Sequence, residues 1–176
     1  MSRIQPERVT DTHAFFWDSL YSQWFTRAGL FKDENGTVYP NAEKYMMMKK
    51  AEVFSAQDIL EKMENTDNPR VVKQLGRQIE NFSDEVWDKH KIDVVTQASY
   101  LKFVQNPDLL KIMMQQEKLI LVEASPEDKI WGIGLHPDND KILDEQNWNG
   151  QNLLGICLMK ARQRIKDEQN SYFNEF

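Results

Sequence analysis

The apolar residues of this chain occur in short segments, and the longest uninterrupted aliphatic run is Leu119–Val122. A helix needs about 20 apolar residues to cross a bilayer, so the sequence predicts no membrane span. Residues 1–8 contain no apolar stretch of the kind found in a secretory signal. We therefore expect a soluble, cytoplasmic protein, and its 176 residues fit one domain built from short elements.

Charge and cysteine usage exclude several classes of protein. The chain has 22 Lys and Arg residues against 28 Asp and Glu residues, and the resulting net charge of -6 disfavours general coating of nucleic acid. The single cysteine, Cys157, excludes an internal disulfide framework. With only three histidines, none at ligand spacing, the composition also argues against a zinc site.

Turn and cap signals divide the chain into a mainly helical α+β fold with a small β-sheet. Helix formers and caps predict helices over residues 42–54, 55–64, 69–75, 83–105, 107–116 and 152–166, the fourth being the longest. We expect a strand within residues 12–25, a hairpin at 30–39, a buried strand at 118–124 and its partner at 129–135. Residues 1–11 form a polar lead-in, 12–166 a single domain, and 167–176 a loose tail.

The first cluster with chemical potential is Glu43 in the first turn of a predicted helix, with Lys50 two turns further along the same face. Such a pair can hold a ribose hydroxyl and a phosphate, or each can shift the pKa of the other. The alternative is ordinary charge complementarity at a helix start, with Lys50 in solvent.

The second cluster is Lys73-Gln74-Leu75-Gly76-Arg77, at the predicted end of a helix. Arg binds phosphate through a bidentate fork and Lys adds a point charge, so these residues can form an anion site. The alternative is the basic charge that commonly ends a helix.

The third cluster surrounds the predicted turn after the buried strand. Glu123 and Asp128 flank this turn, and Trp131 and Gly132 follow. An aromatic plane beside carboxylates suits a ring joined to a sugar, and glycine lets a ligand approach the backbone. The alternative is an exposed hairpin with a core Trp.

The fourth cluster is Asn152, which follows Gly150 at a predicted helix start. A helix N-terminus can bind a phosphate or a ribose, but alone this segment is only a capping motif. The chain lacks both the Walker A pattern and G-x-G-x-x-G, so the sequence argues against the standard P-loop and Rossmann nucleotide-binding folds.

Taken in order, these clusters resemble the NADAR domain family, over roughly residues 14–165. The match rests on the following segments: Phe16-Trp17, Tyr39–Glu43, Lys50-Ala51, Lys73–Arg77, Trp87, Lys102–Pro107, Leu121–Gly134 and Gly150–Arg162. The chain departs from the family pattern at Lys44, where His is frequent, at Asp18-Ser19-Leu20, and in a longer loop over residues 136–149.

The resemblance implies a mainly helical fold with a small sheet, and hydrolysis of the N-glycosidic bond between a ribose and an amino nitrogen. The implied substrates are small nucleotide-like molecules: ribosylamino-pyrimidine phosphates, or ADP-ribose joined to guanine, including guanine in nucleic acid. No metal or other cofactor is implied, and the oligomeric state is left open.

The resemblance also implies roles for single residues. Glu43 is the first candidate for the catalytic carboxylate and Asp128 the second, as a proton donor to the departing amine. Substrate-binding roles fall to Trp17 and Trp131 for the ring, Lys50, Lys73 and Arg77 for phosphate, Glu123 and Asn152 for hydroxyls, and Ser125 and Gly132 beside them. Two alternatives remain: a module that binds ADP-ribose or NAD without cleaving it, and an interaction protein on a decayed enzyme scaffold.

Overall fold

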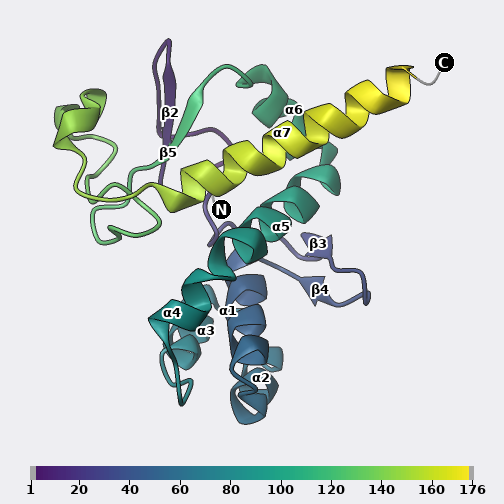
Figure 1. The fold of residues 1–176 in the computed structure, drawn as a ribbon. Helices are drawn as coiled ribbons and strands as arrows, with labels where there is room; N and C mark the ends of the chain where they lie inside the picture. The colour runs from purple at the N-terminus through teal and green to yellow at the C-terminus, as the bar shows by residue number, and fades with distance from the viewer. Residues whose placement is uncertain (1–2, 175–176) are drawn as a thin grey trace.

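A three-stranded sheet of order β1-β2-β5 lies at one end of the computed structural model, which describes residues 3–174, and side chains up to Ser171 (Figure 1). Strands β1 (Arg8–Val9) and β2 (His13–Phe16) are antiparallel, whereas β2 and β5 (Ile120–Glu123) are parallel. The register of the parallel pair places Phe16 opposite Glu123. Residues that follow both strands therefore reach the same edge of the sheet.

The centre of β5 is buried on both faces, as predicted. Leu121 and Val122 point to opposite sides of the strand and have no exposed surface. Leu121 belongs to the main core, and Val122 belongs to a second cluster with Phe15, Ala124, Ile133 and Ile142. The strand is thus fixed from both sides up to Glu123.

The helices form the larger part of the molecule, which confirms the predicted α+β class (Figure 1). Helix α7 packs along α5 and against β5, and α1 packs against α2, α3 and α5. Their bounds are α1 (Ala42–Val53), α2 (Gln57–Glu64), α3 (Pro69–Gly76), α4 (Asp84–Asp88), α5 (Lys91–Val104), α6 (Pro107–Gln115) and α7 (Leu153–Asn174). Two 3-10 turns, Asp140–Leu143 and Glu145–Asn147, lie in the loop before α7.

Several predicted boundaries are confirmed by their hydrogen bonds. The side chain of Asn41 accepts from the backbone N–H of Lys44 at 2.9 Å and caps α1. Pro69 opens α3, and Asn68 caps it. The predicted hairpin pairs β3 (Phe31–Lys32) with β4 (Val38–Tyr39).

Other boundaries were predicted wrongly. Helix α2 begins at Gln57, because Ser55 has a φ of +54° and belongs to the preceding turn. The predicted helix over 83–105 is broken into α4 and α5, since Lys89 and His90 donate to carbonyls three residues back and tighten the turn.

Helix α7 is the longest among the described residues and continues to Asn174, past the predicted end at Lys166. Ion pairing of Arg164 with Glu168 and a hydrogen bond from Gln163 to Asp167 support the extension. Ile156, an apolar residue near the start of this helix, is 37% exposed. Residues 175–176 of the predicted loose tail lie outside the described residues.

Residues 129–135 do not form the predicted partner strand. The Asp128 carboxylate accepts from the backbone N–H groups of Ile130 and Trp131 at 2.9 and 2.8 Å. These donors are therefore unavailable to a β-ladder, and only Ile133 donates to Glu123 O of β5, at 2.9 Å. Within residues 3–174, no helix is long and apolar enough to cross a membrane.

Candidate active site

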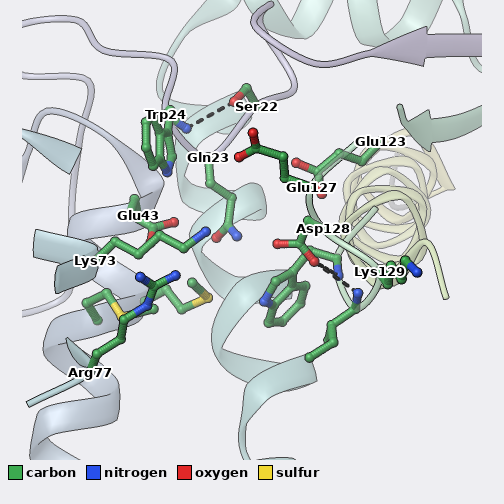
Figure 2. Close-up of a pocket in the computed structure, with 14 residues that line it drawn as sticks. Ser22, Gln23, Trp24, Glu43, Lys73, Arg77, Glu123, Glu127, Asp128 and Lys129 are labelled. Carbon is green, nitrogen blue, oxygen red and sulfur yellow. Dashed lines mark hydrogen bonds between the residues drawn. The ribbon is translucent and has the colours of Figure 1, made fainter. Parts of the chain in front are cut away.

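A cleft lies between the helical part of the molecule and the loop that follows β5. A cavity of about 510 Å³ adjoins one of about 710 Å³; the first, which contains the buried Glu43, is here called the inner cavity, and the second, which contains the exposed Trp17, the outer cavity. They share the residues Ser22, Trp24, Lys73, Arg77, Glu123, Glu127 and Asp128. Figure 2 shows the inner cavity, with carboxylates and basic side chains from distant segments around one space.

Glu43 lines the inner cavity from the first turn of α1. The residue is 3% exposed, and its Oε1 has no hydrogen-bond partner. Its backbone N–H donates to Gln23 O at 3.0 Å, which ties α1 to the residue 22–24 segment. Burial raises the pKa of Glu43 to about 7, with a smaller raising effect of Asp128, while Lys73, a hydrogen bond from the Trp24 side chain and Lys50 oppose the rise.

Glu123 enters the same space from the end of β5. Its Oε2 is buried without a partner, whereas its backbone N–H donates to Asn152 Oδ1 at 2.9 Å. Burial raises the pKa of Glu123 to about 8, and the charges of Asp128 and Glu43 add to the rise, against the opposing charge of Lys73. Two carboxyl groups with raised pKa values thus face one cavity.

Asp128 is the third carboxylate of the inner cavity, and its position is fixed by the turn that it caps. One oxygen, Oδ1, accepts both backbone N–H groups described above. Glu127, next to it, is exposed and lines both cavities. The loop after β5 therefore concentrates negative charge on one wall of the cleft.

Helix α3 provides the opposite charge. Arg70, Lys73 and Arg77 follow a helical spacing of three and four residues, and all three line the cleft. None of them forms a salt bridge within the described part of the chain. In a chain of net charge -6, these unpaired cations mark a local anion site.

The segment Ser22–Trp24 completes the inner wall, and the sequence did not single it out. Lys102, 1% exposed, donates from Nζ to Ser22 O at 2.9 Å. Ser22 Oγ accepts from the backbone N–H of Trp24 at 3.1 Å (Figure 2). A buried lysine of α5 therefore holds this segment against the cavity.

Most of the predicted site residues meet in the cleft. Glu43, Lys73, Arg77, Glu123, Asp128 and Trp131 line the inner cavity. Trp17, 40% exposed, and Ser125 line the outer cavity.

Three predicted residues do not line the cleft. Lys50 donates from Nζ to Gly76 O at 3.2 Å and lies over the Phe82 ring at 4.1 Å. Both polar atoms of the Asn152 side-chain amide form hydrogen bonds with the backbone of β5. Gly132 is packed so closely that a Cβ would lie 2.9 Å from the carbonyl oxygens of both Glu123 and Asp128.

Sequence reasoning missed several cleft residues. Arg70 was detectable, since it lies one turn before Lys73 on the same helix face. Met46 and Met47 are buried and also line the inner cavity. The remaining cleft residues that the sequence did not indicate are Asp18, Ser22, Gln23, Trp24, Gln74, Glu127, Lys129 and Ile130. Asp18 lines the outer cavity.

The NADAR domain model matches residues 10–166, most of the chain. The chain belongs to the NADAR family. It is 41% identical over 166 residues to the N-glycosidase R617 of Acanthamoeba polyphaga mimivirus, covering 88% of this chain and 96% of that protein. It is 29% identical over 160 residues to the maize riboflavin biosynthesis protein PYRR, chloroplastic, covering 85% of this chain and 24% of that protein.

The solved structure of Escherichia coli YbiA shares the fold of this NADAR chain. The two superpose with a TM-score of 0.72 at 24% identity, over 96% of this chain and 92% of YbiA. These findings confirm the predicted family and fold.

Among the positions where this NADAR chain departs from the family pattern, Asp18 lines the outer cavity, whereas Lys44 and Leu20 lie away from the cleft. Lys44 is buried, and its Nζ donates to Asp67 Oδ1 at 2.8 Å and to Glu64 O. Leu20 is fully buried in the main core. Lys44 and Leu20 therefore act on packing, and neither residue lines the cavities.

Proposed function

We propose that this chain is a hydrolase that cleaves the N-glycosidic bond between a ribose and an amino nitrogen of a pyrimidine or guanine base. The observation that carries the proposal is the buried Glu43, whose Oε1 has no hydrogen-bond partner among the described residues, in a cleft with further carboxylates and with cations that form no salt bridge there. The name N-glycosidase, borne by the mimivirus and Escherichia coli relatives, supports the same activity class.

Departure of the base creates an oxocarbenium-like ribose, and Glu43 is placed to stabilise it. A carboxylate beside the anomeric carbon opposes the developing positive charge and orients the attacking water. With a pKa of about 7, Glu43 is partly ionised at neutral pH and can accept a proton from that water. Asp128 is the second carboxylate beside the reacting bond.

The cations of α3 bind the phosphate of the substrate. Lys73 and Arg77 line both cavities, so a phosphate between them spans the inner and outer parts of the cleft. Arg77 provides a bidentate fork and Lys73 a point charge. Lys50, bonded to Gly76 O, supports the end of α3 that carries Arg77.

The aromatic residues of the cleft bind the ring of the substrate. Trp131 lies in the inner cavity and Trp17 at the outer cavity. A ribosylamino-pyrimidine 5′-phosphate fills the inner part, whereas ADP-ribose joined to guanine also uses the outer part with Arg70. The binding of riboflavin-pathway intermediates is supported by the name of the maize relative.

The test is a paired hydrolysis assay read by mass spectrometry. One reaction contains a ribosylamino-pyrimidine 5′-phosphate, and the other contains ADP-ribosylated guanosine, free and in a DNA oligonucleotide. We expect the wild type to release ribose 5-phosphate or ADP-ribose, and Glu43→Gln to lose at least ~100-fold in rate. Glu80→Gln, an exposed site away from the cavities, is the matched control.

Two outcomes contradict the proposal. Full activity of Glu43→Gln removes Glu43 from the catalytic role. Tight binding of both substrates by the wild type, without release of either product, would identify a binding module.

A further inference from the structure

The carboxyl group of Glu123 lies at the junction of the inner and outer cavities, and its backbone is held on three sides. The backbone N–H donates to Asn152 Oδ1 at 2.9 Å, the carbonyl oxygen accepts from Ile133 N at 2.9 Å, and β5 pairs with β2 up to this residue. The side chain projects into the cleft from this fixed point (Figure 2).

Among the described residues, no group forms a hydrogen bond with the end of this side chain. Glu123 Oε2 is buried and makes no hydrogen bond. A buried carboxylate without a donor is unfavourable, whereas a protonated carboxyl carries its own donor for a substrate atom. The site thus provides a place for an O–H group pointing into the cleft.

The surroundings also disfavour a negative charge on Glu123. Glu43 of α1 and Asp128 of its own loop face it, and Lys73 of α3 is the cation that acts on it. Arg77, Glu127 and Lys129 also line the cavity.

Asp128 is arranged differently. Its Oδ1 already accepts two backbone N–H groups, and these hydrogen bonds fix the loop. Of the two carboxyl groups on this wall, Glu123 is therefore the one with a buried oxygen left for a substrate atom.

Resting on the proposed N-glycosidase function, we propose that Glu123 is the general acid that protonates the departing amino nitrogen, in place of Asp128. The C1′–N bond breaks and its electron pair goes to nitrogen, which takes the proton of Glu123. The oxygen of water bonds to C1′, and the water proton passes to the carboxylate of Glu43. Return of that proton to Glu123 restores the starting state, so atoms and charges balance.

The raised pKa values support this division of roles. Burial and the charges of Asp128 and Glu43 raise the pKa of Glu123, whereas at Glu43 the charges of Lys73 and Lys50 and a hydrogen bond from Trp24 oppose the rise in pKa, so the surroundings favour the proton on Glu123. Catalytic acids and bases are recognised by environments that separate two pKa values in this direction.

Leaving-group rescue tests the assignment. Wild type, Glu123→Gln, Asp128→Asn and the control Glu80→Gln are compared on two substrates. One is a ribosylamino-pyrimidine 5′-phosphate, whose amine must be protonated, and the other is 4-nitrophenyl riboside 5′-phosphate, whose phenolate leaves without a proton. We expect Glu123→Gln to lose at least ~100-fold in kcat on the amine and less than ~5-fold on the phenolate substrate.

The wild type alone provides a second measurement. Its kcat on the amine should fall as pH rises through about 8, while its kcat on the nitrophenyl substrate should not. This measurement holds even if the Glu123→Gln variant folds poorly.

Equal losses of Glu123→Gln on both substrates would overturn the assignment, and so would leaving-group rescue of Asp128→Asn instead. If the wild type cleaves neither substrate, the proposed function itself fails, together with the inference that rests on it. A wild type that cleaves the amine with no decline above pH 8 refutes the role of Glu123 only.

Discussion

The side-chain amide of Asn152 fixes the backbone of Glu123, with Oδ1 accepting from the Glu123 N–H at 2.9 Å. Its Nδ2 donates to Leu121 O, also at 2.9 Å, so one side chain bonds two positions of β5. Asn152 has a φ of +52°, a left-handed conformation that Asn tolerates better than most residues. The predicted contact of Asn152 with substrate hydroxyls is thereby replaced by a role in positioning β5.

Asn152→Ala is expected to lower the free energy of unfolding by ~2–4 kcal/mol, because it leaves two buried backbone groups unsatisfied and strains the left-handed position. Urea denaturation measures the loss. Asn152→Gly relieves the backbone strain but not the lost hydrogen bonds, and should recover only part of it. An unchanged midpoint for Asn152→Ala would contradict this account.

The raised pKa values of Glu43 and Glu123 predict that removing either charge increases the free energy of unfolding, by an amount that depends on pH. Each native pKa lies above the ordinary value of 4.5, so the unfolded chain ionises first and native stability falls as pH rises from about 4.5 to about 8. Glu43→Gln and Glu123→Gln should gain stability across this window, on the order of 1–3 kcal/mol by pH 8. Thermal unfolding at pH 4.5, 6 and 8 measures it. A gain of equal size at pH 4.5 would refute the explanation.

Lys73→Met is expected to change both binding and pH dependence. Loss of a phosphate contact should raise KM about tenfold for a phosphorylated substrate and much less for the dephosphorylated nucleoside. The charge of Lys73 lowers the pKa of Glu43, so its removal should move the acidic limb of the pH–rate profile to higher pH. Lys111→Met, at an exposed position of α6, is the control. A KM change of the same size with both substrates would exclude the phosphate role.

We expect Glu7 to affect substrate binding, although it lies outside residues 10–166, which the family model matches. Its carboxylate accepts from the N–H groups of Trp17 and Asp18 and from Ser19 Oγ, at 2.9, 3.1 and 3.0 Å. Glu7→Ala should release Trp17 and raise KM about threefold to tenfold with little change in kcat. Steady-state kinetics beside exposed Glu34→Ala measures the effect. A fall in kcat at constant KM would point to a different role.

Because the pKa of Lys102 is lowered, we expect the native state to become more stable as the pH rises into the alkaline range. Burial, with a contribution from Arg27, lowers its pKa from 10.5 to about 7. The native state therefore binds fewer protons than the unfolded chain, and stability from this group increases as pH rises from about 7 to 10.5. Lys102→Met should abolish that increase and lower activity, since Ser22 loses its donor. Urea midpoints at pH 7, 8.5 and 10 test the slope, which should persist in Lys111→Met.

Local signals explain which elements were predictable. Asn41, Pro69 and the turn at Asp33–Gly36 act on their own neighbours, and each boundary was predicted correctly. The strand expected at 129–135 failed because Asp128 binds the N–H groups that a strand would use. An alternating apolar pattern cannot reveal that competition.

The site was predictable to the extent that its residues lie in recognisable motifs. Glu43, Lys73 and Asp128 were found in this way, and all three line the cleft. Trp24 was missed because its position depends on Lys102, whose partner Ser22 lies 80 residues away in sequence. Such long-range contacts leave no local pattern.

The walls of the cleft come from segments near residues 22, 43, 73 and 128, and Asn152 at the start of α7 fixes one of them. A ribosome-bound chain that ends before Asn152 therefore contains every cavity-lining residue but lacks the side chain that fixes β5. Catalytic competence should appear late in synthesis, together with cooperative folding of the whole domain. Loss of activity in denaturant should then coincide with loss of helical circular dichroism, which makes turnover a direct reporter of the folded fraction.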